Sequence, residues 1–361
     1  MHKTIKYILL AVIILVNNVK LFAQGSEIAL GAYYFDGWTG AYPSHITQTL
    51  IDSFPEREPK WGWKTSSQEI VDEQIILAAK AGLSFFSFCW YYNGAEKFKT
   101  EPLNQAQRLF LKSPEKNKLK YCLLVANHQG FEISPSDWSI VTSEWINQFK
   151  DPSYLRVDGK PLLIFFSSLI SKFGTADAVG LALNNFREAA KKAGLNGVTI
   201  ALCTNPDETA IKDAELCGFD VLTGYNYHTA GYGNSRKLPI NNLINGEFLA
   251  WNRFSKFSKL KYIPVVTLNW DARPWATPDN TYSTSPYYVG YSPGSVFKSV
   301  QNCIGWLNTN VGTATKERVA ILYAWNEIGE GPYLTPSKNG INMLEGVKKA
   351  LLFQLKSTTG P

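Results

Sequence analysis

Two glutamates near the end of the 361-residue chain, Glu327 and Glu330, stand three residues apart, and glycines flank the second of them. Two carboxyl groups that converge on one pocket divide the work of glycosidic bond cleavage, because one protonates the leaving oxygen while the other is base, nucleophile or charge stabiliser. Repulsion and aromatic surroundings separate their pKa values, as this division requires. We expect both to be catalytic. The alternatives are a helix cap by Glu330 and an ion pair between Glu327 and an arginine.

Aromatic, amide and charged residues follow many short apolar runs of the chain. Aromatic rings suit the apolar faces of a pyranose, and amide, carboxylate, guanidinium and imidazole groups supply directional partners for hydroxyl groups. We therefore predict a carbohydrate cleft. The residues expected to bind its sugar are Tyr34, Asp36, Trp38, Trp90, Tyr91, Asn127, His128, Asn205, Tyr225, Tyr227, His228, Trp270, Asp271, Arg273, Trp325 and Asn326.

Several of these residues have more than one interpretation. Asp271 is also a candidate for the second catalytic carboxylate, or a partner of Arg273 in a salt bridge or turn. Asp36 precedes a glycine, and an Asp-Gly turn explains it without a ligand. His128 and His228 are expected to bind hydroxyl groups, since no ordered spacing of histidines and carboxylates predicts a metal. We expect neither metal nor cofactor.

Eight β-rich runs must position these residues. Most are continuously apolar, as is typical of strands buried on both faces of a parallel sheet. Helical periodicity alternates with them, most clearly over 67–81, 104–111, 175–192, 248–260 and 340–355. The strands are expected at 28–35, 83–90, 119–126, 161–167, 198–203, 219–225, 262–269 and 319–325.

This alternation predicts an α/β protein with a single (β/α)₈ barrel, whose catalytic groups follow the C-terminal ends of the strands. A doubly wound open sheet is the alternative, but no glycine-rich phosphate loop follows the first strand. Gly82 and Gly194 are expected just past two helices. Predicted helix starts lie at Ser67, Asp137, Asp207 and Ser295.

Residues 1–23 have a basic start, a ten-residue apolar core and a small residue near the end, as a secretory signal peptide does. A membrane anchor is the alternative, although the core is short for a span. We expect export to the periplasm or beyond, no stable membrane insertion after cleavage, and one catalytic domain over 24–361. Removing Lys3, Lys6 and Lys20 lowers the net charge from +6 to +3, because +6 − 3 = +3. This charge is small and dispersed, so nucleic acid is excluded as a partner.

The chain has five cysteines and no C-x-x-C spacing. Three of them sit inside apolar runs, where cysteine behaves as a small buried hydrophobic residue. Inert core thiols are therefore expected, with a disulfide framework as the alternative.

The segment 324–336 reads A-W-N-E-I-G-E-G-P-Y-L-T-P. It resembles the N-E-W-x-E-G signature of the glycoside hydrolase family 71/99-like superfamily. That group includes endo-α-mannosidases and a WbsX-like branch described as glycosyltransferases. The segments 31–34, 82–94, 126–127 and 269–273 look similar in the same order, so the resemblance covers most of the mature chain.

The resemblance implies a (β/α)₈ barrel that acts on α-linked glycans without metal. In the endo-mannosidases the first glutamate deprotonates the sugar 2-hydroxyl, which attacks the anomeric carbon, while the second protonates the leaving oxygen. By this resemblance Glu327 is the base, Glu330 is the acid and then the base, and configuration is retained. Ile328 and Gly329 depart from the pattern, because a tryptophan and a histidine are typical at these positions.

Three functions stay open at this point. The first is an exported, monomeric glycoside hydrolase. The second is a glycosyltransferase, although the chain has no D-x-D metal motif and export separates it from nucleotide sugars. The third is a carbohydrate-binding protein with a decayed catalytic centre, which the two intact glutamates argue against.

Overall fold

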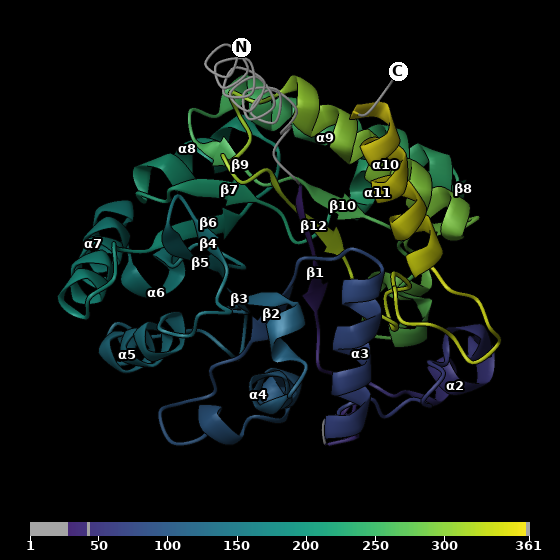
Figure 1. Cartoon of the computed structure of the whole chain (residues 1–361), viewed down its shortest axis with the longest axis horizontal. Coiled ribbons are helices and arrows are strands. Elements are labelled where there is room, and N and C mark those ends of the chain that lie inside the picture. The colour runs from purple at the N-terminus through teal and green to yellow at the C-terminus, as the bar shows by residue number, and fades with distance from the viewer. Residues whose placement is uncertain (1–27, 42–43, 359–361) are drawn as a thin grey trace, which may run out of the picture.

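Ten strands of the computed structural model form one curled sheet (Figure 1). The structure describes residues 28–41 and 44–358, so the predicted signal peptide at 1–23 lies outside the described residues. Nine strands run parallel in the order β10-β12-β1-β2-β3-β5-β6-β7-β9, and β4 pairs antiparallel with β5. Their bounds are β1 (Ala29–Tyr34), β2 (Phe85–Trp90), β3 (Lys120–Val125), β4 (Arg156–Val157), β5 (Lys160–Phe165), β6 (Thr199–Cys203), β7 (Val221–Thr223), β9 (Lys261–Tyr262), β10 (Val265–Thr267) and β12 (Val319–Tyr323).

Helices lie outside the curled sheet in Figure 1. A separate parallel pair joins β8 (Lys237–Pro239) to β11 (Tyr287–Val289). The helices are α2 (Gln48–Ser53), α3 (Gln68–Lys80), α4 (Gln105–Lys112), α5 (Trp138–Phe149), α6 (Ile170–Phe173), α7 (Ala176–Lys192), α8 (Glu208–Leu216), α9 (Ile240–Phe257), α10 (Pro293–Thr309) and α11 (Leu344–Thr358).

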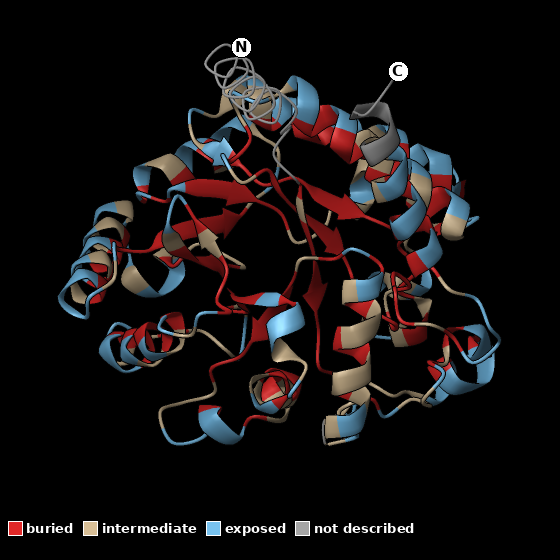
Figure 2. Ribbon diagram, viewed as in Figure 1, coloured by how far each residue is buried: buried red, intermediate tan, exposed pale blue. Residues whose placement is uncertain are grey.

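All eight predicted strands are present, and they explain the continuous apolar runs. Every residue of β2, β6 and β12 is buried, because helices cover one face of the sheet and side chains from the other strands cover the opposite face. Figure 2 shows this burial along the strands, with exposed residues on the outer sides of the helices. The seventh predicted strand is interrupted, since Ile263 and Pro264 separate β9 from β10.

The two ends of the strand order meet at this interruption. The amide of Ile263 donates to the carbonyl of Leu222, which lies in β7, over 2.9 Å. The amide of Ile321, which lies in β12, donates to the carbonyl of Pro264 over 3.0 Å. Residues 261–267 therefore contact both β7 and β12.

The helix boundaries follow local chemistry. The side chains of Ser67 and Asp207 accept amide hydrogen bonds at the starts of α3 and α8, as predicted. Asp137 occupies the cap position of α5, but its side chain accepts from the hydroxyl of Ser134 and not from an amide of the helix. The prediction for Ser295 is wrong, because Ser292 caps α10 and Ser295 completes a capping box inside its first turn.

Two predicted helices start elsewhere. The helix expected at 248–260 begins at Ile240 and ends at Phe257, and Gly246 lies inside it, where close packing leaves no room for a side chain. A Cβ at Gly246 would lie 2.0 Å from the carbonyl oxygen of Ala230. The helix expected at 340–355 begins at Leu344. Gly82 and Gly194 have φ of +91° and +88°, as expected for residues that end helices.

Aromatic side chains dominate the core, and Trp145, Trp251 and Trp306 are among the largest fully buried residues. All five cysteines are buried and free, which confirms the prediction of unpaired core thiols. Among residues 28–41 and 44–358, no helix is long and apolar enough to cross a bilayer.

Candidate active site

A tight turn after β12 carries both glutamates. The carbonyl of Glu327 accepts hydrogen bonds from the amides of Glu330 (3.1 Å) and Gly331 (2.9 Å). Gly331 has φ of +98°, which glycine adopts without a Cβ penalty. Beyond the turn, the amide of Leu334 returns to the carbonyl of Trp325 over 2.8 Å. The backbone therefore fixes the two glutamates relative to each other and to the end of the strand.

The carboxyl groups of the pair lie in different surroundings. Glu327 is 3% exposed and its Oε1 accepts a hydrogen bond from the hydroxyl of Tyr225. Burial raises the pKa of Glu327 to about 7, and the bond from Tyr225 opposes this rise. Burial raises the pKa of Glu330 to about 8. The Oε2 atom of each glutamate is buried without a hydrogen-bond partner among the described residues.

Phenol groups surround the pair. Burial raises the pKa of Tyr91 and Tyr225 well above the usual range, and the charges of both glutamates add to the rise. Burial and the same two charges also raise the pKa of Tyr282. Tyr282 was not predicted, because it lies in a short helical turn far from any strand end, and its residue type was its only signal in the sequence.

Ion pairs and hydrogen bonds from Arg57, Asp271 and Arg273 hold the turn that carries the glutamates. Asp271 accepts from Arg273 at 2.7 and 2.8 Å and from Arg57 at 2.6 Å. Burial raises the pKa of Asp271, but the bonds from Arg273 and the charge of Arg57 outweigh it and leave the pKa below its usual value. Arg57 also donates to the carbonyl of Ile328 (3.1 Å), and the amide of Asp271 donates to the carbonyl of Glu330 (2.6 Å). Arg57 was not predicted, because no motif or periodicity in the chain points to it.

Three predicted residues around the turn bond to the protein itself. The Oδ1 atom of Asn326 accepts from the amide of Phe35 at 2.9 Å, and its carbonyl accepts from Nε1 of Trp38 at 2.8 Å. Trp325 donates through Nε1 to Gln74 of α3 at 2.7 Å. All three predicted residues are buried, so they attach the turn to β1, to the loop that follows it and to α3.

A second group of predicted residues also lies in the interior. Asp36 accepts from the hydroxyl of Ser66 and from the amide of Ala106 at the start of α4, and burial raises its pKa to about 7. Asn127 exchanges two hydrogen bonds with the backbone of Ser167, at 2.7 and 3.0 Å. The remaining buried members of the group are Tyr34, Trp90 and Tyr227.

Four predicted residues are either stacked on another ring or more exposed than the preceding group: His228, Trp270, His128 and Asn205. His228 stacks on Trp270 with ring centroids 3.8 Å apart, and burial lowers its pKa to about 4, so it is neutral at pH 7. His128 is partly exposed and its ring lies 5.9 Å from that of Tyr91. Asn205 is exposed just beyond the end of β6.

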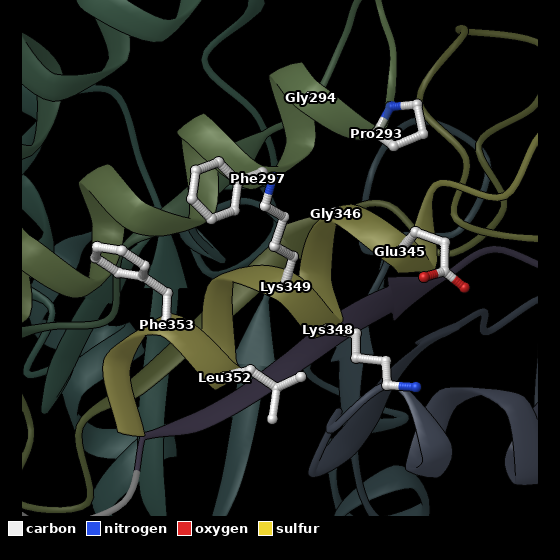
Figure 3. A pocket seen from close by; sticks show the side chains of 9 residues that line it. All are labelled: Pro293, Gly294, Phe297, Glu345, Gly346, Lys348, Lys349, Leu352 and Phe353. Atoms are coloured by element: carbon white, nitrogen blue, oxygen red, sulfur yellow. The ribbon is translucent and has the colours of Figure 1, made fainter. Parts of the chain in front are cut away.

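A cavity of the molecule lies away from the glutamate pair. It has a volume of about 570 Å³ and is lined only by residues of α10 and α11 (Figure 3). Lys349 lies over the ring of Phe297 there, 5.0 Å from its centroid. None of the predicted sugar-binding residues lines it. In the described part of the chain, no group of three or more His, Cys, Asp and Glu side chains is placed to hold a metal ion.

The curled parallel sheet with outer helices is similar in fold to solved structures of glycoside hydrolases. A structure described as a glycoside hydrolase-like protein has a TM-score of 0.63 to this chain at 16% identity, covering 91% of this chain and 94% of that one. The GH99 endo-alpha-mannosidase from Bacteroides thetaiotaomicron has a TM-score of 0.61 at 16% identity, covering 92% and 98%. A glycoside hydrolase family 5 enzyme from Prevotella bryantii has a TM-score of 0.53 at 11% identity, covering 90% and 96%.

The family itself is identified from the sequence. The family model described as Glycosyltransferase WbsX matches residues 61–347, so the chain belongs to that family. Together with the structural neighbours, this match confirms the predicted membership of the glycoside hydrolase family 71/99-like superfamily. No curated protein matches the chain.

Proposed function

We propose that the chain is a glycoside hydrolase that cleaves an α-linked glycan with retention of configuration. The observation that carries this proposal is the glutamate pair after β12. Each member has a raised pKa and one buried oxygen without a partner, so each is ready to exchange a proton with a ligand. The fold shared with an endo-alpha-mannosidase supports an α-linked glycan as the substrate.

The surroundings of the pair support different roles for its members. Tyr225 donates to Glu327, which favours the carboxylate form, so Glu327 is the base. Glu330 has the higher pKa, so it holds its proton longer and is the acid. Glu327 takes the proton of the sugar 2-hydroxyl, whose oxygen attacks the anomeric carbon as the glycosidic bond breaks. Glu330 gives its proton to the leaving oxygen.

The second half of the reaction restores both groups. Glu330, now a carboxylate, takes a proton from water, which opens the anhydro-sugar at the anomeric carbon. Glu327 returns its proton to the 2-oxygen. Two inversions at the anomeric carbon give net retention.

We divide the predicted sugar-binding residues into two groups. Tyr91, His128, Asn205, Tyr225, His228 and Trp270 are proposed ligand contacts, and Tyr282 joins them. The other ten side chains are buried or paired with the protein, and we assign them to supporting the site: Tyr34, Asp36, Trp38, Trp90, Asn127, Tyr227, Asp271, Arg273, Trp325 and Asn326.

We also propose that residues 24–361 form one catalytic domain in which the sheet closes as a (β/α)₈ barrel. The contacts of residues 261–267 with both β7 and β12 support closure. Export after removal of residues 1–23, and action as a monomer, belong to the same proposal.

Digestion of an α-linked glycan panel tests the hydrolase. The protein from residue 24 onwards is incubated with each glycan beside Glu330→Gln and Glu327→Gln, and products are read by mass spectrometry. We expect fragments from at least one glycan and a loss of at least ~100-fold in rate for each variant. Full turnover by Glu330→Gln would contradict the assignment.

The family description as a glycosyltransferase gives a second candidate. The same panel is therefore repeated with nucleotide sugars as donors. A product longer than the starting glycan, dependent on the nucleotide sugar, would identify a transferase and reject the hydrolase.

A further inference from the structure

Trp275 occupies the space beside the glutamate turn that a side chain at position 329 would fill. A Cβ built on Gly329 would lie 2.2 Å from Cε2 and 2.4 Å from Nε1 of the indole of Trp275. No side chain at 329 fits while the indole is there. The space beside Gly329, one of the two residues between the glutamates, is thus filled by an aromatic ring from a different loop.

This loop is anchored so that the ring has a defined position. The hydroxyl of Thr47 donates to the carbonyl of Pro274 at 3.0 Å, and the side chain of Asn280 donates to the carbonyl of Trp275 at 2.8 Å. Oδ1 of Asn280 accepts from the amide of Tyr282 at 3.1 Å. Asn280 therefore links Trp275 to Tyr282, whose pKa is raised in part by the charges of both glutamates.

Two ring nitrogens beside the turn have no partner. Nε1 of Trp275 and Nδ1 of His45 are buried without a hydrogen bond among the described residues. Their rings lie 5.9 Å apart, and both contact Phe35, at 6.4 and 4.9 Å. A buried indole N–H normally finds an acceptor, because an unpaired donor loses the hydrogen bonds that it made with water. The cluster therefore holds two ring nitrogens that the described part of the protein leaves without a hydrogen-bond partner.

The chemistry of the cluster selects a neutral, hydroxyl-rich ligand. Burial lowers the pKa of His45, so its imidazole is uncharged at neutral pH. An aromatic ring with an N–H donor and a neutral imidazole suits one apolar sugar face and its edge hydroxyls. A phosphate or carboxylate would find no cation among Trp275, His45 and Phe35.

We propose that Trp275, assisted by His45, determines specificity by binding the sugar residue held against the glutamate turn. The indole N–H donates to a hydroxyl oxygen of that sugar, and the imidazole nitrogen bonds a second hydroxyl. This inference rests on the proposed function, because the sugar is the one presented to Glu327 and Glu330.

The test compares Trp275→Phe with the unaltered protein on each cleaved glycan. The phenyl ring keeps an aromatic face and removes the N–H. We expect kcat/KM to fall ~10-fold or more through a higher KM, since a substrate hydroxyl loses its donor. Trp61→Phe is the matched control, because Trp61 gives its N–H to Glu73 on the surface of the molecule and no glycan loses a contact.

His45→Phe is the second variant, and a thermal melt checks that each variant is folded. We expect both site variants to lower kcat/KM on the same glycans. Unchanged kcat/KM for folded Trp275→Phe and His45→Phe on every cleaved glycan would overturn the inference while leaving the hydrolase intact.

If no glycan is cleaved, the proposed function has failed. A binding measurement still tests the inference in that case. The indole ¹⁵N–¹H signal of Trp275, assigned by its loss in Trp275→Phe, is followed as each glycan of the panel is added to Glu330→Gln. A shift of this signal supports the sugar contact. No shift with any glycan overturns it.

Discussion

At the scale of single residues, the two glutamates that we propose as catalytic differ in the groups that surround them. Glu327 receives a hydrogen bond from Tyr225, whereas Glu330 meets only burial, and the pKa of Glu327 is accordingly lower than that of Glu330. The order matters because the base must lose its proton while the acid keeps it. The sequence predicts the pair from residue type and spacing. It does not predict Tyr225 as the donor, because a position 102 residues away becomes adjacent only in the folded sheet.

The pH dependence of the rate follows from these two pKa values. Below about pH 7 Glu327 gains a proton and stops acting as a base, and above about pH 8 Glu330 loses the proton that it must give. We expect a bell-shaped profile of kcat/KM with its maximum between these limits. The profile is measured on the glycan cleaved fastest, over pH 5 to 10. Tyr225→Phe removes the bond to Glu327, so its acidic limb should move to higher pH. An acidic limb that stays in place would contradict the role of Tyr225.

At the scale of elements, the turn after β12 depends on a side chain that no strand end supplies. Arg57 is 5% exposed and joins the carbonyl of Ile328 to the carboxylate of Asp271. From the sequence, Asp271 and Arg273 are a pair with several possible roles. In the structure, Arg57 also binds the carboxylate of Asp271. An arginine that lies far away in the chain gives no periodicity or motif by which sequence reasoning finds it.

Replacing Arg57 should therefore damage both stability and catalysis. Arg57→Met leaves Asp271 with one guanidinium partner and the carbonyl of Ile328 without a donor. We expect the free energy of unfolding to fall by about 3 kcal/mol, because a buried carboxylate loses one of its two cationic partners and buried carbonyls lose a donor. Urea titration measures this, and kcat/KM should fall because the glutamate turn loosens. Lys338→Met is the control, since its ion pair with Glu58 is exposed and contributes little. Equal stability of the two variants would contradict the supporting role of Arg57.

At the scale of the whole molecule, continuous apolar runs predict all eight strands, because parallel strands need no polar face. Helix starts are predicted less well. The helix α9 begins eight residues before the predicted start, and Gly246 lies inside it, where it admits the backbone of Ala230. Packing of this kind is set by the partner segment, so no local pattern contains it. The gap between β9 and β10 is likewise not predicted, because the apolar run at 262–269 has the pattern of one continuous strand.

Closure of the sheet depends on the residues between β9 and β10, which bond to both β7 and β12. Hydrogen exchange tests this closure. If residues 261–267 close the barrel, the amides of Ile263 and Ile321 are internal to a ring without edges, and they exchange only when the whole domain unfolds. Exchange followed by mass spectrometry should give peptides covering 261–267 and 319–323 the same slow rate as a peptide covering β1. The loop at 129–136 serves as the fast reference, because much of it is exposed. Fast exchange at 261–267 beside a protected β1 would mean an open sheet, with β7 and β12 as its edges.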